Sequence, residues 1–349
     1  MTPDTTSIAA ARARVTEMIT GCWRTQVIHE AVRLGLPDLL AAGPASSSDL
    51  ALRLAVDADA LYRLLRGLAA IGLAEHLGGQ HFTLTADGAT LCRDAPDSLR
   101  GIAVHWGVRQ WKSLGLLGRA IDSGHSQMAA GTEGFEILQR DPVQADVFNR
   151  AMAEQSLRIG EAAARAYDFS PFRSILDVGG GYGAVLVALL RAQPAARGAS
   201  FDLPEVEAGA LAYLREAGMA DRAGYLGGSF FEAVPQGHDC LVLKYIIHDW
   251  GDAPSRAILT QCRKAVAPGG VVLLIEQVLP ERITAQPDVA GMIRGDLIML
   301  NIGGKERTER EYRALLAESG LELTRIVPTD TVFSVIEARP AGSRAEPGA

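Results

Sequence analysis

The alternation of apolar and polar residues divides the chain into a helical N-terminal part and a C-terminal part in which strands and helices alternate. Between residues 8 and 167, apolar residues recur at helical spacing, beginning with the segment 23–44, which ends at a Gly-Pro pair. The expected strands cover residues 174–179, 198–204, 222–231 (with a turn), 239–248 and 271–280, the expected helices 184–194, 206–218, 254–270 and 308–320, and a closing hairpin 321–340. This order predicts a doubly wound α/β domain. Asp252 is expected to cap the helix 254–270, and Gly269 is expected to mark its C-terminal stop.

The first hundred residues carry a winged-helix pattern. Ser48 is expected to cap one short helix and Asp57 a second, and two strands follow around the turn at Gly78-Gly79. Such a domain serves either DNA recognition or packing and dimerisation. The second helix offers only two arginines to a phosphate backbone, which favours dimerisation. We therefore divide the chain into a winged-helix-like dimerisation domain (8–100), a helical linker and pocket region (101–167) and an α/β domain (168–339).

Composition narrows the class of protein. The 349 residues are 48% hydrophobic and 21% charged, as in ordinary soluble globular proteins. The net charge of -7 argues against a nucleic acid as the main partner. The four cysteines are scattered, so neither a disulfide framework nor a structural zinc site is expected. We find no secretory signal and no apolar run long enough for a membrane span, and we expect a cytoplasmic protein without a membrane partner.

The segment LDVGGGYGA, residues 176–184, joins a strand end, a glycine-rich turn and a helix start. Gly179, Gly181 and Ala184 fit the fingerprint G-x-G-x-x-A, in which glycines let the backbone approach a nucleotide closely. Asp202 ends the next expected strand, where a carboxylate can accept both hydroxyls of a ribose. The cofactor could be a nicotinamide dinucleotide or S-adenosylmethionine. Asp177 would repel a pyrophosphate but suits an ammonium or a nearby sulfonium, which favours S-adenosylmethionine.

Six segments in order make the chain resemble the small-molecule O-methyltransferases of the caffeate, acetylserotonin and hydroxyneurosporene type, including bacterial natural-product enzymes. They are LDVGGGYG, FDLP, GGSFFEAVP, LKYIIHDWGD, PGGVVLLIE and GGKERTEREY, and the likeness spans about residues 15–338. The resemblance implies an N-terminal winged-helix dimerisation domain and a C-terminal Rossmann-like methyltransferase domain. It also implies a homodimer that converts S-adenosyl-L-methionine to S-adenosyl-L-homocysteine.

The resemblance implies three catalytic residues. His248, at the end of the apolar run LKYIIH, would be the general base, because an imidazole of pKa near 6.5 can take a proton from a phenol of pKa near 10. A lone histidine after an apolar strand is otherwise typical of a core, but sites in α/β proteins lie at the carboxyl ends of strands. Glu276 would orient the imidazole, and Glu306 would be a second flanking carboxylate. A capping box of Thr308 and Glu311 gives Glu306 an alternative role as an acid at a helix start.

The resemblance also implies a cofactor site. The expected residues are Asp177, Gly179, Gly181, Asp202, Leu203, Ser229, Phe230, Phe231, Lys244, Asp249 and Trp250. Ser229 stands where the family usually has an acid that contacts the adenine amino group. A serine there can accept one hydrogen bond but loses the charge-assisted contact.

The expected acceptor is a planar aromatic small molecule with a phenolic hydroxyl, such as a phenazine or anthracycline of bacterial secondary metabolism. Its expected pocket walls are Trp106, Trp111, Phe148, Met152, Asp296, Met299 and Asn301, although an aromatic stripe such as the one in residues 97–167 is also typical of a core. No His, Asp or Glu cluster has metal-ligand spacing in the sequence, which favours a base-catalysed route without a metal. Two alternatives stay open: an NAD-dependent oxidoreductase on the same glycine turn, and a winged-helix regulator with a non-catalytic methyltransferase domain.

Overall fold

A computed structural model describes residues 5–96, 98–125 and 142–342, and for residues 5–7, 142–152 and 154 it describes the backbone alone. The chain forms two compact units, Met1–Gly115 and Leu116–Ala349. The division falls inside the region 101–167 that we predict as a linker, so the three proposed domain boundaries stay a prediction. Within the described residues, no helix is both long and apolar enough to cross a membrane.

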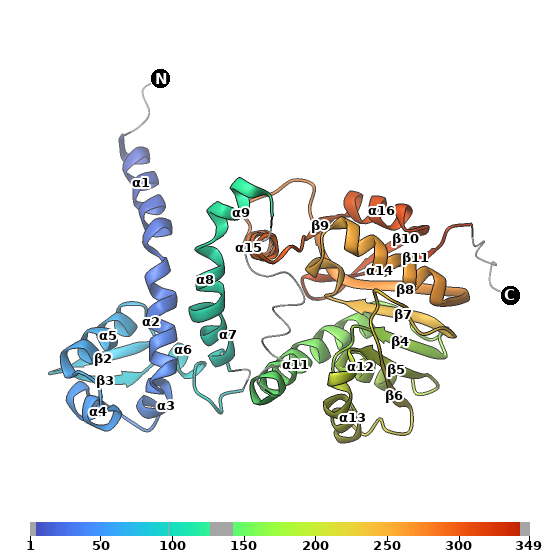
Figure 1. Ribbon diagram of the computed structural model, residues 1–349. Coiled ribbons are helices and arrows are strands. Elements are labelled where there is room, and N and C mark those ends of the chain that lie inside the picture. Colours follow the sequence, from blue (N-terminus) through green and yellow to red (C-terminus); the bar gives the residue numbers. More distant parts are fainter. Residues whose placement is uncertain (1–4, 97, 126–141, 343–349) are drawn as a thin grey trace. The chain divides into compact units, whose positions relative to one another are not determined.

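The first unit is a helical domain with a small three-stranded sheet (Figure 1). Its strands β1 (Ala45–Ser46), β2 (Ala74–Gly78) and β3 (His81–Leu84) pair antiparallel in the order β1-β3-β2. Its helices are α1 (Thr5–Thr20), α2 (Cys22–Arg33), α3 (Leu36–Ala41), α4 (Ser47–Leu54), α5 (Ala58–Ala70), α6 (Ala86–Ala89), α7 (Arg100–His105), the π-helix η1 (Trp106–Gln110) and α8 (Trp111–Leu114). The order of α4, α5 and the β2–β3 hairpin confirms the predicted winged helix.

The caps of the two winged-helix helices were predicted with different success. Asp57 does cap α5, because its Oδ1 accepts the N–H of Ala60 at 2.8 Å. The predicted cap Ser48 is wrong, since the hydroxyl of Ser46 accepts the N–H of Asp49 at 3.1 Å and α4 already begins at Ser47. The three consecutive serines have the same capping propensity, and only Ser46 has the extended backbone that a cap requires.

The second unit is built around a mainly parallel sheet with strand order β10-β11-β8-β7-β4-β5-β6. The strands are β4 (Ser174–Val178), β5 (Arg197–Asp202), β6 (Ala223–Gly227), β7 (His238–Lys244), β8 (Val266–Leu279), β9 (Arg307–Thr308, paired with β8), β10 (Leu321–Pro328) and β11 (Phe333–Pro340). The helices are α9 (Leu117–Ser123), α11 (Pro142–Ala166), α12 (Ala184–Ala192), η2 (Pro204–Val206), α13 (Glu207–Glu216), η3 (Ile247–Asp249), α14 (Asp252–Ala265), α15 (Pro287–Ile302) and α16 (Glu309–Glu318). The antiparallel pair β10–β11 confirms the predicted closing hairpin.

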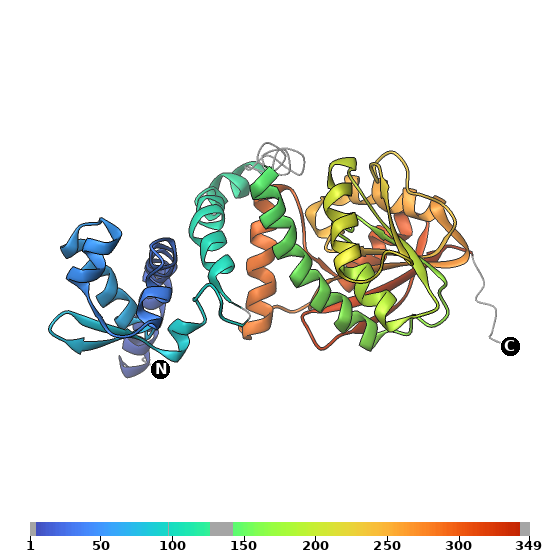
Figure 2. The same cartoon turned by 90° about the horizontal axis from the view of Figure 1, so that it is seen from below.

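Helices cover both faces of this sheet because successive side chains of each strand point to opposite faces. In β7, Cys240 and Val242 pack into the core under α11, α12 and α13, whereas Leu241 and Leu243 pack into the core under α14 and α16. Figure 1 shows the two helical layers on opposite sides of the sheet, and in Figure 2 the α11–α13 side faces the reader. The doubly wound architecture predicted from the apolar runs is confirmed.

One helix end differs from the prediction. Helix α14 ends at Ala265, four residues before the predicted stop at Gly269. Gly269 lies within β8, with φ of +78°, between Val266, which pairs with His238, and Val271, which pairs with Cys240. The glycine therefore forms an irregularity in the strand ladder rather than a helix terminus, a distinction that depends on strand pairing and not on local sequence.

Candidate active site

The glycine-rich turn between β4 and α12 packs tightly against its neighbours. Gly179 and Gly181 have φ of +70° and +54°, in the left-handed region that favours glycine. A Cβ on Gly179 would lie 2.5 Å from the side chain of Ile246, and one on Gly180 would lie 2.6 Å from the carboxylate carbon of Asp177. Gly179 and Gly180 therefore leave no room for a side chain, and the bare backbone there is what close approach of a nucleotide-type ligand requires.

Two carboxylates flank this turn. Asp177 in β4 is buried, and burial raises its pKa to about 7 against the opposing charge of Lys244. A cationic ligand beside Asp177 would favour its ionised form. Asp202 ends β5, and its two oxygens accept the N–H groups of Gly181 at 2.8 Å and Leu203 at 2.7 Å. Each oxygen keeps a lone pair for a ribose hydroxyl, so the geometry is compatible with the predicted role of Asp202.

An aromatic corner follows the ends of β6 and β7. The rings of Phe230, Phe231 and Trp250 contact one another edge to face, with centroids of Phe231 and Trp250 4.8 Å apart. Phe231 is 37% exposed, which leaves apolar ring surface for a flat ligand. The hydroxyl of Ser229 accepts the N–H of Phe231 at 3.3 Å. If the Ser229 hydroxyl contacts the adenine, it does so while it also accepts this local hydrogen bond from Phe231.

His248 lies in η3, directly beyond the carboxyl end of β7, and is only 4% exposed. Its Nδ1 lies 3.0 Å from Oε1 of Glu306, and its Nε2 lies 3.3 Å from Oδ1 of Asp249. Burial lowers the pKa of His248, but the carboxylates of Asp249, Glu306 and Glu276 outweigh burial and raise it to about 9. The surrounding carboxylates therefore favour the imidazolium form in this arrangement, and the Nε2 edge faces a carboxylate.

Glu276 and Glu306 divide their roles differently from the prediction. Oε1 of Glu276 accepts the N–H groups of Ile246 at 3.0 Å and Ile247 at 2.9 Å. Glu276, which we expected to orient the imidazole, thus holds the backbone of the loop that carries His248. The side-chain contact that orients the imidazole comes from Glu306, which lies before the capping box of α16 and is not part of it.

The same three residues form a compact buried cluster. Donor atoms of His248, Glu276 and Glu306 all lie within 4.8 Å of one another, a spacing that could hold a metal ion and that the sequence did not indicate. Burial raises the pKa of Glu276 to about 7 against the charge of His248. A protonated Glu276 beside a Glu306–imidazolium pair would satisfy the charges of this cluster without a cation. The metal-free route stays a prediction.

Sequence reasoning missed Arg307, the buried centre of this loop. Its guanidinium donates to the carbonyls of Ile247 at 3.1 Å and Trp250 at 2.9 Å and to Oδ1 of Asp252 at 2.8 Å. The predicted capping role of Asp252 is wrong, because α14 is capped at Gly251 without a side-chain bond and the Asp252 carboxylate is bound to Arg307. Arg307 therefore fixes the loop on both sides of His248.

Tyr245 was missed as well. It follows β7 directly and has φ of +58°, a conformation that costs a non-glycine residue about 1–3 kcal/mol. Its ring lies on the imidazole of His248, with centroids 3.5 Å apart and planes 14° from parallel. No pattern in the sequence indicates this contact, because a residue at the end of a strand is expected to continue extended.

Lys244 ends β7 at the same edge of the sheet. Its Nζ donates to the hydroxyl of Ser156 on α11 at 2.8 Å. Burial lowers the pKa of Lys244 and outweighs the carboxylates of Asp177 and Glu276, which act to raise it. The lysine therefore links β7 to α11 beside the glycine turn, and its predicted contact with the cofactor stays a prediction.

Family models match both units of the chain. A model described as the O-methyltransferase domain matches residues 115–322, more than half of the chain, and one described as the O-methyltransferase dimerisation domain matches residues 16–94. The chain belongs to the O-methyltransferase family. The nicotinamide and regulator alternatives are thereby set aside, and the protein is an S-adenosylmethionine-dependent enzyme.

Known proteins resemble this O-methyltransferase over nearly its whole length. It is 38% identical to phenazine O-methyltransferase PhzM of Lysobacter antibioticus over 326 residues, covering 93% of this chain and 95% of the relative. The structure of mitomycin 7-O-methyltransferase MmcR superposes with a TM-score of 0.88 at 34% identity, covering 97% of this chain and 100% of MmcR. NcsB1, from neocarzinostatin biosynthesis and solved with S-adenosylmethionine and 2-hydroxy-5-methyl naphthoic acid, has a TM-score of 0.79 at 32% identity, covering 90% of this chain and 95% of NcsB1.

The predicted acceptor residues of the O-methyltransferase fall in several places. Trp106 and Trp111 lie in the first unit, in η1 and at the start of α8. The side chains of Phe148 and Met152 on α11 lie outside the described residues. The remaining three, Asp296, Met299 and Asn301, are on α15.

Helix α15 is tied to His248 through Glu306. Oδ1 of Asp296 accepts the N–H of Glu306 at 2.9 Å, so Asp296 supports the residue that orients His248 and is not simply a pocket wall. Met299 is half-buried, and Asn301 is fully buried. Their contact with an acceptor stays a prediction.

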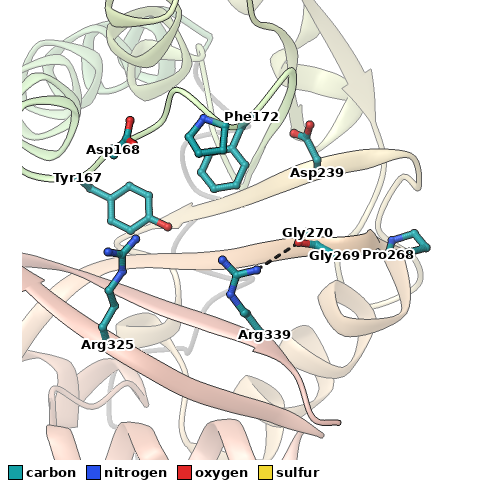
Figure 3. A pocket seen from close by; sticks show the side chains of 10 residues that line it. Tyr167, Asp168, Phe172, Asp239, Pro268, Gly269, Gly270, Arg325 and Arg339 are labelled. Carbon is teal, nitrogen blue, oxygen red and sulfur yellow. Dashed lines mark hydrogen bonds between the residues drawn. The ribbon is translucent and has the colours of Figure 1, made fainter. Parts of the chain in front are cut away.

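A cavity of about 370 Å³ lies elsewhere, at the amino ends of β7 and β8 (Figure 3). Arg325 lies over the ring of Tyr167 at 4.7 Å from its centroid, and Arg339 donates to the carbonyl of Gly269 at 3.2 Å. Both arginines bind the carboxylate of Glu337, which is 4% exposed. This cavity is at the opposite end of the strands from His248, so it is not the site of methyl transfer.

Proposed function

We propose that this enzyme methylates a phenolic hydroxyl of a planar aromatic natural product and that His248 is the base that removes the hydroxyl proton. The observation that carries the proposal is the position of His248, buried just beyond the carboxyl end of β7, the strand next to β4 and its glycine turn, and fixed at Nδ1 by Glu306. Fixing Nδ1 leaves Nε2 to meet the acceptor, once the hydroxyl replaces Asp249 at that edge. PhzM and mitomycin 7-O-methyltransferase, named for a phenazine and for mitomycin, support an acceptor of this class.

The residues present fit S-adenosylmethionine. The bare turn at Gly179–Gly181 and the carboxylates of Asp177 and Asp202 would hold it, and the aromatic corner of Phe231 and Trp250 would pack on its adenine. When bound, S-adenosylmethionine supplies a methyl group already activated on a sulfonium. The protein then has to bind, align and deprotonate the acceptor.

The electrostatics of His248 suit a phenol. The pKa of the imidazole is raised to about 9, close to the value near 10 of an ordinary phenol. The imidazole is the base in its neutral form, so it first gives its own proton to solvent; the carboxylates around it then bring its pKa closer to that of the phenol than the value near 6.5 of an unperturbed histidine. The cationic product is stabilised by Glu306 on its Nδ1 side.

The proposal is tested by a methyl-transfer screen against a phenol library, read by mass spectrometry, followed by kinetics on the best acceptor. His248→Ala should lower kcat about a hundredfold or more and leave S-adenosylmethionine affinity within a few-fold. His238→Ala, at the opposite end of β7, is the matched control and should keep kcat. Turnover by His248→Ala close to that of the parent would remove the base assignment. Methylation of amines but no phenols would remove the acceptor class.

We also propose that the enzyme is a homodimer through its first unit. The dimerisation-domain model covers residues 16–94, and α1 exposes large apolar side chains: Val15, Met18 and Ile19 are 52%, 77% and 72% exposed. Exposed apolar side chains grouped on one helix are typical of an interface. Light scattering should give twice the chain mass for the parent and a weaker dimer for Met18→Glu. A monomer at micromolar concentration would contradict the proposal.

A further inference from the structure

Tyr245 is an exception in the backbone of the second unit. Among the described residues of that unit, it alone combines a side chain with a φ in the left-handed region, at +58°. Such a conformation persists only where the surrounding structure fixes it, and it is concentrated at functional sites. Tyr245 lies between β7 and η3, three residues before His248. Its unusual backbone is therefore part of the connection that delivers the base.

Contacts from two neighbouring strands hold the ring of Tyr245. Its hydroxyl accepts a hydrogen bond from Nε2 of Gln277 on β8 at 2.9 Å. Phe333 on β11, which is paired with Gln277, meets the ring edge to face with centroids 5.0 Å apart. The Nζ of Lys244 lies 5.6 Å from the ring centroid. The ring is thus fixed by the sheet before it meets the imidazole.

The fixed ring covers one face of His248. The centroids are 3.5 Å apart and the planes are 14° from parallel, so the two rings are stacked. Glu306 holds Nδ1, Asp249 faces Nε2, and Glu276 holds the loop backbone. Each of these carboxylates contacts an edge of the imidazole or the main chain, whereas the ring of Tyr245 lies on the imidazole face.

We propose that Tyr245 is the positioning residue of the base: its ring fixes the plane of the His248 imidazole and stabilises the imidazolium that forms when the acceptor hydroxyl gives up its proton. The proton moves from the acceptor oxygen to Nε2, and the negative face of the phenol ring interacts favourably with the cation so formed. The inference rests on the proposed function, since it requires His248 to be the base.

Two substitutions test the contribution of the Tyr245 aromatic ring separately from that of its hydroxyl and from that of its apolar volume. Tyr245→Phe keeps the stacked ring and should retain kcat within about threefold. Tyr245→Leu keeps apolar bulk without a ring, and it should lower kcat about tenfold or more. Because the imidazolium loses its stacked partner, the acid limb of the pH–rate profile should also move to lower pH in Tyr245→Leu. The affinity for S-adenosylmethionine, measured by calorimetry, should stay within a few-fold in both variants.

Three outcomes would overturn the inference. One is a Tyr245→Leu variant that keeps the kcat and the pH profile of the parent enzyme. The second is equal impairment of both, which would assign the effect to the hydroxyl and Gln277. The third is loss of S-adenosylmethionine affinity together with kcat, which would show a merely structural role. His248→Ala is measured in parallel: if it stays active, the proposed function fails, whereas an inactive His248→Ala beside a fully active Tyr245→Leu removes this inference alone.

Discussion

The carboxylate of Asp249 should set the pH dependence of the enzyme. Burial alone would lower the pKa of His248, and the carboxylates around it, Asp249 first among them, raise it to about 9. Asp249→Asn removes the charge 3.3 Å from Nε2 and keeps the size of the side chain. The imidazolium loses a stabilising partner, so it should release its proton at a lower pH than in the parent enzyme.

The size of the shift follows from the geometry. A unit charge at this distance, in a medium of effective dielectric constant about 20, stabilises a cation by about 5 kcal/mol at most. The Asp249 side chain is 26% exposed, so solvent screens part of this energy. Opposite charges at such distances shift a pKa by about 1 to 3 units. We therefore expect the acid limb of kcat/KM to move down by about 1 to 3 pH units from its position in the parent.

The assay is the initial rate of acceptor methylation from pH 6 to 10 at saturating S-adenosylmethionine, with cofactor affinity checked at each pH. Asp288→Asn, which removes an exposed carboxylate at the start of α15, is the control and should leave the limb in place. A limb that moves by less than about 0.3 units in Asp249→Asn would refute the electrostatic reasoning. A limb that moves upward would show that the charge acts on a different group.

Three further outcomes are expected. Arg307→Leu leaves buried loop carbonyls without their donor, and the free energy of unfolding in urea should fall by about 3–5 kcal/mol; a loss below about 1 kcal/mol would contradict the role of the guanidinium. Burial raises the pKa of Glu337, but hydrogen bonds led by that from the Tyr167 hydroxyl outweigh burial and lower it. The ionised form is therefore stabilising above the unfolded pKa near 4.3 and loses that effect as pH falls through the lowered folded value. Glu337→Gln should accordingly be less stable than the parent at pH 7, and the difference in thermal melts should shrink as pH falls through the lowered folded pKa, whereas the exposed control Glu322→Gln should match the parent throughout. Ser229→Asp should bind S-adenosylmethionine about tenfold more tightly by calorimetry if this position faces the adenine amino group, and equal affinity would place the adenine elsewhere.

Features that depend on local sequence could be predicted. The apolar runs indicated the strands of the parallel sheet, and the cap at Asp57 and the capping box of Thr308 and Glu311 are where propensity places them. The glycine turn was predicted because its function requires a particular residue type at a particular spacing. These features involve residues close together in the chain, so the pattern and the structure report the same interaction.

Features that depend on contacts between residues far apart in the sequence could not be predicted. From the sequence, Glu276 and Glu306 were both expected to flank the imidazole of His248. Only the arrangement of β8 and β9 decides that Glu306 contacts Nδ1 whereas Glu276 binds the loop backbone. The sequence shows Arg307 only as a charged residue near a helix start. Its burial follows from contacts with residues 52 to 60 positions earlier in the chain. Tyr245 reads as the last residue of a strand, although its left-handed backbone ends the strand.

The adjacency of Glu306 and Arg307 constrains how this enzyme can change. Glu306 directly precedes the two-residue strand β9, and Arg307 is its first residue. The carboxylate of Glu306 contacts the imidazole of His248, and the guanidinium of Arg307 contacts the backbone of the loop that carries this histidine. Pairing of Val278 with Arg307 fixes which residue serves which partner. An insertion or deletion of one residue here would exchange the two and bring a cation to the base. Recombination with relatives should therefore keep Asp296 and the segment 303–308 from one parent.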